Sequence, residues 1–344
     1  MCLAAGQRTV PDEFTVHSCH CYFILAGSAD IPIMFHVEKV RDGRSFMTRT
    51  VQARQRGRAI FTTTMSFVRE EAPATQVRHA LPMPVDEDGR PLQPPADDWQ
   101  PDESISTGPY ESGGIKVVNR ESPNAHEKKT RQWIRARGTI KGGHQAHLNA
   151  LAYVSDSYFI GTISRIHRLW RFPFKVEEID QLPKETLDHI QRLNDFEGGG
   201  MDLKSFGDRP QIGMMVSLDH TIYFHEPRRV KADDWMLAEM DSPWAGDGRG
   251  VVTQRIFAKD GTLLATCVQE VSYLRYGSMY CHLLTIPHRD FVDSRRHRRK
   301  RVVRKRPNCK IMIQRFIRKA VCILIIRRVL RRPSLHKTSR ILLR

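Results

Sequence analysis

The sequence predicts an α+β protein made of two similar units, and two observations carry this prediction. Alternating segments rich in β-branched and aromatic residues are typical of antiparallel strands, and Gly-containing turns join them. In addition, the motif His20-Cys-Tyr-Phe recurs about 200 residues later as His220-Thr-Ile-Tyr-Phe. Each copy precedes an Asp-Gly-Arg triplet, a long strand, a turn glycine and a return strand. Features repeated in the same order indicate a duplicated unit.

The first unit is assigned to residues 1–71. Segment Val16–Phe67 alternates, with a hairpin expected between Ser45–Gln55 and Ala59–Phe67 around an Arg-Gly pair. Only Met1–Thr9 precede these strands, and we expect that segment to be the end of a longer helix whose start is missing. Without the rest of that helix, the first sheet would expose apolar surface.

Residues 72–127 are interpreted as a solvated acidic linker. Segment Ala72–Gly114 holds eight of the 19 prolines together with many Asp, Glu and Ser residues. This composition opposes packed helices and strands.

The second unit is assigned to residues 128–275. A helix is expected near His144–Ile160, because Leu148, Leu151 and Phe159 recur at helical spacing. The expected strands are Gln132–Ile140, Met214–Phe224, Gly250–Ala258 and Thr262–Glu270, and a Lys-Asp-Gly turn separates the last two.

The formal charge of +17 belongs to one end of the chain. Segment Arg295–Arg344 carries 20 of the 55 Lys and Arg residues and no acid, which leaves 35 basic residues against 38 acidic ones. We therefore expect no specific nucleic-acid partner for the body. Residues 276–344 form a basic tail, interpreted as a disordered or artefactual extension. Alternatively, Ile311–Arg332 contacts anionic membranes or nucleic acid.

Seven cysteines without a CxxC pair favour a reducing compartment. The N-terminal segment is too short for a signal peptide, and no apolar run reaches the roughly 20 residues that span a bilayer. These features predict a soluble, intracellular body.

Long ordered motifs occur in both units. The first unit contains Val16-His-Ser-x-His-x-Tyr-Phe, and the second contains Arg131-Gln-Trp-Ile-Arg-Ala-Arg-Gly and Ser242-Pro-Trp-Ala-Gly. In these motifs the chain resembles the acyl-CoA thioesterase II family, which includes peroxisomal enzymes. The resemblance covers roughly residues 11–270, except the linker and residues 164–203.

The resemblance implies two hotdog folds in one chain, each with an antiparallel sheet wrapped around a central helix. Acyl-CoA would bind between the halves, and water activated by an Asp, a Ser or Thr and a Gln would hydrolyse the thioester without cofactor or metal. The matching positions are Asp156, Ser217 and Gln269. Asp219 and His220 are expected to support Ser217.

The family also implies a peroxisomal location and homo-oligomers formed edge to edge. The C-terminal Leu-Leu-Arg is not a Ser-Lys-Leu-type peroxisomal address, so a cytoplasmic location is the alternative. Val271-Ser272 can be encoded by a splice-donor sequence, and a retained intron is expected from Val271 onward.

Taken alone, each candidate side chain has a simpler interpretation. Asp156 is either a general base or a helix-end carboxylate in a cap or ion pair. Gln269 shares a strand face with Ala265 and Cys267, and either orients a water or reaches solvent from the strand end. Ser217 is either a ligand of the attacking water or a small polar filler.

Two rival functions are kept. One is a hotdog enoyl-CoA hydratase or dehydratase, which would need a catalytic Asp/His pair. The other is an inactive product whose basic tail binds membrane or nucleic acid. The cluster His17, Cys19, His20 and Cys21 does not predict a metal site, because strand alternation turns His20 away from the other three and no second Cys/His group follows.

Overall fold

The computed structural model describes residues 1–70, 77–105, 108–172, 174–200, 202–207 and 209–275, all within one compact unit. Residues 276–344 lie outside the described residues, so the expectations for the basic tail stay predictions. The unit boundary drawn at residue 71 and the retained intron also stay predictions.

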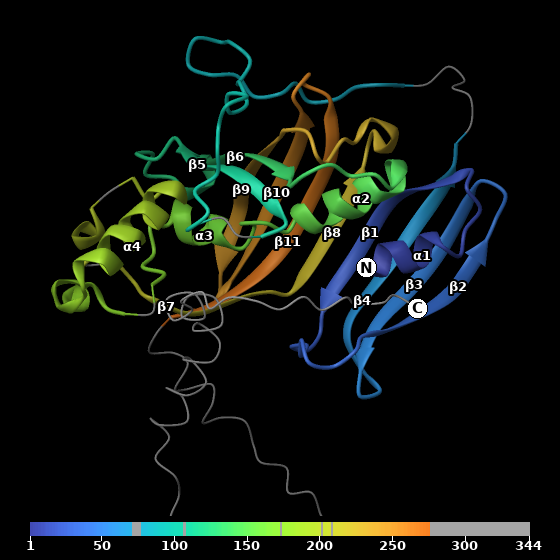
Figure 1. The fold of residues 1–344 in the computed structure, drawn as a ribbon, viewed down its shortest axis with the longest axis horizontal. Helices are drawn as coiled ribbons and strands as arrows, with labels where there is room; N and C mark the ends of the chain where they lie inside the picture. The colour runs from blue at the N-terminus through green and yellow to red at the C-terminus, as the bar shows by residue number, and fades with distance from the viewer. Residues whose placement is uncertain (71–76, 106–107, 173, 201, 208, 276–344) are drawn as a thin grey trace, which may run out of the picture. The chain divides into compact units, whose positions relative to one another are not determined.

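Eleven antiparallel strands form one sheet in the described residues (Figure 1). Their order is β2-β3-β4-β1-β8-β11-β10-β9-β6-β5, and β7 lies beside the end of β11. The strands are β1 (Phe14–Phe23), β2 (Met34–Asp42), β3 (Phe46–Gln55), β4 (Arg58–Arg69), β5 (Tyr110–Val118), β6 (Lys129–Ala136), β7 (Ile212–Ser217), β8 (Asp219–Phe224), β9 (Met236–Gly246), β10 (Arg249–Ala258) and β11 (Leu263–Arg275).

The two halves of the sheet meet at a seam between β1 and β8. These strands carry the two copies of the repeated His motif, and Cys21 pairs with His220 across the seam. Outward from it, β4 corresponds to β11, β3 to β10 and β2 to β9. The symmetric order supports the duplication that the repeated motif indicated.

The hairpin expected in the first unit is confirmed. β3 pairs with β4 along their whole lengths, and the connection is Arg56-Gly57. Both residues have positive φ, 51° and 74°. Such a two-residue turn matches the twist of the flanking strands, and glycine adopts the conformation without steric cost.

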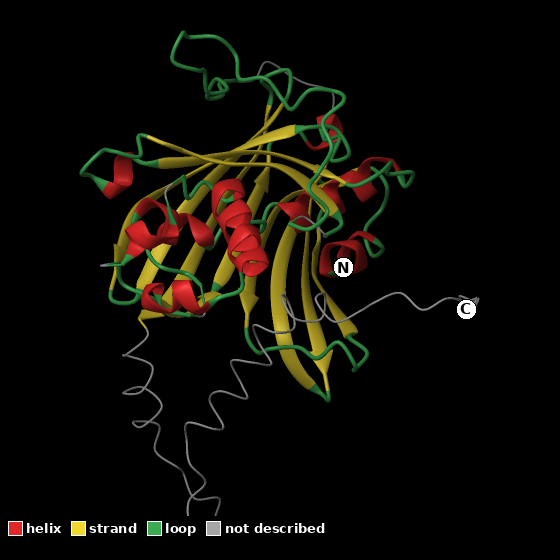
Figure 2. Cartoon of the chain, turned by 60° about the vertical axis from the view of Figure 1, so that its left-hand side comes forward, coloured by secondary structure: helices red, strands yellow, loops and turns green. Residues whose placement is uncertain are grey.

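Helices cover one face of the sheet (Figure 2), with α1 over the first half and α2 over the second (Figure 1). Leu148 and Leu151 on α2 are fully buried against the sheet. Asn149 Nδ2 on α2 donates to Gln7 Oε1 on α1 at 3.0 Å, which links the halves above the seam. The helical elements are α1 (Cys2–Gln7), α2 (Gly143–Val154), α3 (Gly161–Ile166), α4 (Lys184–Phe196) and the 3₁₀ turns η1 (Ala125–Glu127), η2 (Val176–Gln181), η3 (Leu203–Phe206) and η4 (Pro227–Arg229).

The helix expected to reach Ile160 ends at Val154. The Ser155 hydroxyl donates to the Ala152 carbonyl at 3.2 Å, and Tyr158 adopts φ 58°. Ser and Asp side chains compete for backbone hydrogen bonds and therefore favour turns. Asp156 thus lies in a turn between α2 and α3, not on a helix.

Two further expectations were wrong. The strand expected at 214–224 is broken at Leu218, whose N–H donates to the Glu270 carbonyl at 2.9 Å, so β7 and β8 pair with β11 at different places. The segment interpreted as linker contains β5, which pairs with β6. Ile115 and Val117 on β5 are buried, and this burial outweighs the turn-forming residues before them.

The described residues within 164–206, largely outside the family resemblance, form a lobe with its own small core. The lobe contains α4 and lies at the left of Figure 1. Its buried apolar side chains are Trp170, Phe172, Ile179, Ile190, Leu203 and Phe206. In the described residues, no helix has the length and apolar character needed to cross a membrane.

Candidate active site

A cavity of about 580 Å³ lies between the two halves of the sheet and the helices above them. The first half contributes apolar side chains from β1 to β4, and the second half contributes α2, the turn after it and β8. The lining includes Phe23, Ile33, Phe35, Ile60, Phe61 and Met65 from the first half, and Tyr110, Ala152, Tyr153, Asp156, Tyr158 and His220 from the second. The cavity is therefore mostly apolar with a few polar groups on one wall, as small-molecule sites commonly are.

Asp156 is the carboxylate on that wall, and solvent reaches it from the cavity. Its Oδ1 accepts a hydrogen bond from Gln269 Nε2 at 2.7 Å. The protein encloses the carboxyl on its other sides, and this burial raises its pKa above the usual range, although the bond from Gln269 opposes the rise. A carboxylate with a raised pKa and an accessible oxygen is equipped to accept a proton.

Gln269 on β11 is fully buried, so the interpretation that it reaches solvent was wrong. Cys267 and Val271 share its face of the strand and are buried with it. Among the described residues, Gln269 Oε1 has no hydrogen-bond partner. The Gln269 amide therefore acts on Asp156 through its NH₂ group.

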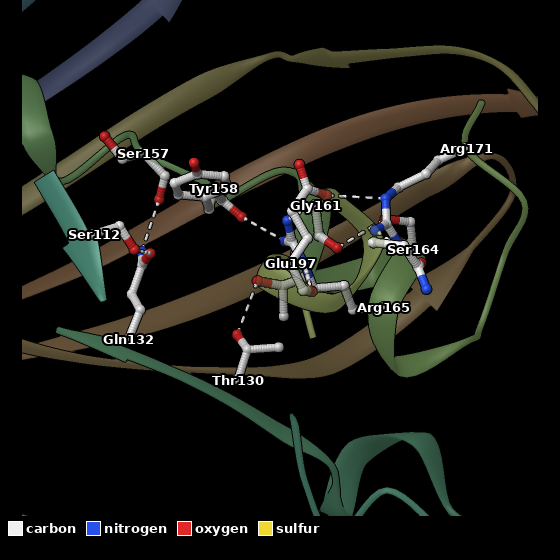
Figure 3. Close-up of polar contacts among 12 residues, drawn as sticks. Ser112, Thr130, Gln132, Ser157, Tyr158, Gly161, Ser164, Arg165, Arg171 and Glu197 are labelled. Carbon is white, nitrogen blue, oxygen red and sulfur yellow. Dashed lines mark hydrogen bonds and ion pairs between the residues drawn. The ribbon is translucent and has the colours of Figure 1, made fainter. Parts of the chain in front are cut away.

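The turn that carries Asp156 is held by two buried side chains (Figure 3). Gln132 Nε2 on β6 donates to the Ser157 carbonyl at 3.3 Å, and Arg165 Nη1 on α3 donates to the Tyr158 carbonyl at 3.1 Å. Arg165 is itself paired with Glu197 at 3.3 Å. These bonds fix the backbone directly after Asp156.

His220 holds the other side of the same turn. Its Nε2 lies 3.0 Å from Ser155 Oγ, and its ring packs edge-on against Phe159 at 5.6 Å between centroids. Burial lowers the pKa of His220 to about 4, so the imidazole is neutral at physiological pH. Asp219 Oδ1 accepts from the Glu270 N–H at 2.7 Å. Asp219 and His220 thus contact neighbours of Gln269 and Asp156, not Ser217.

Comparison with known proteins identifies the chain. The family model described as the acyl-CoA thioesterase N-terminal domain matches residues 1–68, and the one described as the C-terminal domain matches residues 86–273. Acyl-coenzyme A thioesterase 8 of Mus musculus is 32% identical over 284 residues, which cover 78% of this chain and 76% of that protein. The chain belongs to the acyl-CoA thioesterase II family.

A solved structure and a yeast protein are also similar to this thioesterase. The acyl-CoA thioesterase II TesB2 from Mycobacterium marinum is 27% identical with a TM-score of 0.55, covering 79% of this chain and 86% of that one. The peroxisomal acyl-coenzyme A thioester hydrolase 1 of Saccharomyces cerevisiae is 23% identical over 333 residues, covering 80% and 84%. These findings confirm the α+β double hotdog and the hydrolysis of acyl-CoA thioesters, and they set aside the hydratase alternative.

Ser217 forms no hydrogen bond with the Asp156–Gln269 pair of this thioesterase within the described residues. It ends β7 and pairs with Val271, so both side chains lie on the sheet face that also carries Gln269. Ser217 is not among the residues that line the cavity, and its hydroxyl makes no hydrogen bond within the described residues. Its role stays a prediction.

Three positioning residues of the thioesterase were missed by sequence reasoning, namely Gln132, Ser155 and Arg165. Gln132 lies inside the motif that begins at Arg131, and Ser155 directly precedes Asp156, but Gln and Ser are common in structural roles. Arg165 lies in the lobe, where the family resemblance gave no guide. The positioning role of Arg165 is visible only in the folded chain, where the side chain is buried beside Glu197.

The Cys/His cluster on β1 differs from the expected alternation. A bulge between Val16 and Ser18 turns His17 to the opposite face from Cys19, where its ring packs against Phe46 at 5.8 Å. Within the described ranges, no group of three or more His, Cys, Asp or Glu side chains is placed to hold a metal ion.

Proposed function

We propose that this chain hydrolyses fatty acyl-CoA with a water that Asp156 deprotonates and that Gln269 helps to position by fixing the carboxylate. The bond between these two side chains at the wall of an apolar cavity is the observation that supports the proposal most. The acyl chain would occupy the apolar part of the cavity, which places the thioester carbonyl near Asp156.

The proposed reaction has two steps. Water attacks the carbonyl carbon while Asp156 takes one of its protons, and a tetrahedral intermediate forms. The carbon–sulfur bond then breaks, CoA leaves as a thiolate, and the proton held by Asp156 passes to the products. A thiolate is a good leaving group, so activation of water suffices and no covalent intermediate is required.

The cavity thiols support water as the nucleophile. Burial raises the pKa of Cys21 to about 11, and burial also raises the pKa of Cys19 well above its usual range. A thiol attacks only as the thiolate, and neither cysteine forms much thiolate at neutral pH. Cys21 Sγ instead donates to Thr63 Oγ1 at 3.3 Å.

Ser217 is proposed as a further ligand of the attacking water, with Asp219 and His220 in supporting roles. What supports this is the register, which sets Ser217 on the same sheet face as Gln269. Ser217→Ala tests it: we expect a roughly tenfold loss of kcat, the usual effect of losing one positioned hydrogen bond. Unchanged kcat would remove Ser217 from the site.

The deciding experiment measures CoA release from palmitoyl-CoA by the purified chain, with a thiol blank for its own cysteines. Asp156→Asn keeps the size of the side chain but removes the base, and we expect kcat to fall by at least about 100-fold. The matched control is Asp98→Asn, because Asp98 is exposed in the segment before β5. Wild-type kcat in Asp156→Asn would overturn the proposal.

We also propose a peroxisomal location and self-association, by analogy with the yeast relative and with the family. A fluorescent fusion that fails to co-localise with a peroxisomal marker would contradict the first. The second would be contradicted by a monomeric mass in light scattering at micromolar concentration.

A further inference from the structure

A recess lined by five basic side chains lies where the lobe meets the second half of the sheet. It is distinct from the apolar cavity and encloses about 10 Å³, room for one water-sized group. We call it the basic recess, and its cationic residues are Arg120, Lys128, Arg165, Arg168 and Arg171. The backbone of Gly198 and Gly199 completes one side.

Two carboxylates contact this set of cations. Glu197 pairs with Arg165 at 3.3 Å and with Arg171 at 2.9 Å, which forms the ion-pair group at the right of Figure 3. Glu121 pairs with Arg168 at 2.6 Å, but its side chain is 81% exposed. Neither carboxylate lines the recess. The recess therefore carries more positive than negative charge.

The two remaining cations form no ion pair with a carboxylate within the described part of the chain. Arg120 donates to the carbonyls of Gly198 and Gly199, and Lys128 Nζ donates to the Ile166 carbonyl at 3.3 Å. Carbonyl oxygens satisfy hydrogen bonds but do not neutralise a charge.

The cations also act on one another. Burial, and then the charge of Arg168, lowers the pKa of Arg120 and that of Lys128, although the charge of Glu121 opposes the decrease in both. In addition, Arg168 Nε is buried without a hydrogen-bond partner in the described residues. An anion at this place would accept a hydrogen bond from the Arg168 Nε–H and would offset the repulsion among the cations.

We propose that the basic recess binds a phosphate-type anion. Guanidinium groups present paired N–H donors that match the oxygens of a phosphoryl group, and four arginines line this one recess. One phosphoryl oxygen fits the enclosed volume while the rest of the group stays at the mouth. The anion is either a phosphate of the CoA nucleotide or a separate phosphate compound.

The recess is joined to the apolar cavity through Arg165. That side chain lines the recess, and its guanidinium lies 5.6 Å from the centre of the Tyr158 ring, which lines the cavity. Anion binding does not depend on the proposed hydrolytic residues. Only the assignment of the phosphate to the substrate depends on the proposed function.

The first test is the thermal stability of the full chain in inorganic phosphate against sodium chloride of equal ionic strength. We expect a saturable rise in melting temperature with phosphate alone, and at least tenfold weaker binding in Lys128→Gln and in Arg168→Gln. Arg192→Gln, an exposed change on α4 with the same loss of charge, should bind as the wild type does. Phosphorus NMR titration of the wild-type chain gives an answer even if a variant fails to fold.

No effect of phosphate beyond that of chloride, or undiminished binding in both variants, would overturn the proposal. The source of the anion is separated by KM values for palmitoyl-CoA and for palmitoyl-N-acetylcysteamine, which lacks phosphate. A higher KM for palmitoyl-CoA alone in Lys128→Gln assigns the recess to the CoA nucleotide. Weaker phosphate binding with both KM values unchanged assigns it to a separate anion. Either result leaves the role of Asp156 to its own test.

Discussion

Gln269 Nε2 lies 2.7 Å from Asp156 Oδ1, although the two residues are 113 positions apart in the chain. One belongs to the middle of a buried strand and the other to an irregular turn. The strand places the amide rigidly, and the amide in turn places the carboxylate. The buried Gln269 thus holds the Asp156 carboxylate in place at the cavity wall.

The bond makes a prediction about pH. A hydrogen bond to the ionised carboxyl lowers its pKa, so Gln269→Leu should raise the pKa of Asp156 further. Hydrolysis needs the ionised base, and therefore the acidic limb of the kcat profile should move to higher pH. At neutral pH we expect kcat to fall by roughly 10- to 100-fold, as for a lost hydrogen bond to a charge. The measurement is CoA release across pH 5 to 9.

Gln254 offers a matched control on the neighbouring strand β10. It is fully buried like Gln269, and both atoms of its amide lack hydrogen-bond partners among the described residues. Gln254→Leu should leave the pH profile in place, and it should not lower the free energy of unfolding, because unsatisfied amide atoms cost about 1–3 kcal/mol when buried. Equal shifts of the profile in the two variants would contradict the assignment.

His220 predicts a loss of stability in acid. Its pKa is about 4 in the folded chain and about 6.5 in an unfolded chain, so the unfolded chain binds a proton that the folded chain rejects between these pH values. Above pH 6.5 the neutral His220 leaves the free energy of unfolding unchanged. As pH falls from 6.5 toward 4, the free energy of unfolding decreases by about 3 kcal/mol in all. Urea unfolding at pH 7.5, 5.5 and 4.5 measures it.

His220→Gln serves as the comparison, because glutamine does not titrate. We expect the free energy of unfolding of this variant to fall less than that of the wild type between pH 7.5 and 4.5. Parallel pH dependence in the two proteins would show that other groups cause the acid sensitivity.

The contacts of Arg165 predict that the stability of the lobe and the activity of the site depend on each other. Its side chain is 3% exposed and pairs with Glu197, which is 18% exposed. Breaking a buried ion pair typically costs about 3–5 kcal/mol, and we expect Arg165→Met to lose roughly that much unfolding free energy. The Tyr158 carbonyl also loses its donor, so kcat should fall in the folded fraction. Guanidinium unfolding together with CoA release checks both effects.

Arg192→Gln is again the suitable control, since Arg192 is 57% exposed and lies 3.8 Å from Asp102. An exposed pair of this kind contributes at most about 1 kcal/mol. A loss in Arg165→Met no larger than that of the control would mean that the lobe does not support the turn.

Much of this fold was predictable because it rests on local patterns. The alternation between Val16 and Phe67 and the turn at Arg56-Gly57 specify a hairpin from neighbouring residues alone. The repeat of the His20 motif at His220 indicated the duplication, which places these two strands beside each other. The family resemblance supplied the Asp156–Gln269 pair, which no periodicity would have joined.

The missed features depend on contacts between distant segments. β5 follows a proline-rich stretch, and only its pairing with β6 makes it a strand. The break at Leu218 exists because β11 is long enough to pair with both β7 and β8. The Arg165–Glu197 pair likewise joins residues 32 positions apart across the lobe. Such contacts are decided by packing, which a single sequence does not display.

Ala152 predicts how the cavity selects its substrate. This small side chain on α2 lines the cavity four residues before Asp156. In Ala152→Phe the aromatic ring would fill apolar space that a long acyl chain needs, while a short chain would still fit. We expect kcat/KM for palmitoyl-CoA to fall at least tenfold more than kcat/KM for butyryl-CoA, since the excluded methylenes contribute about 0.8 kcal/mol each. Ala152→Ser, which adds little volume, should change both substrates equally. An equal loss for both substrates in Ala152→Phe would mean that the acyl chain lies elsewhere.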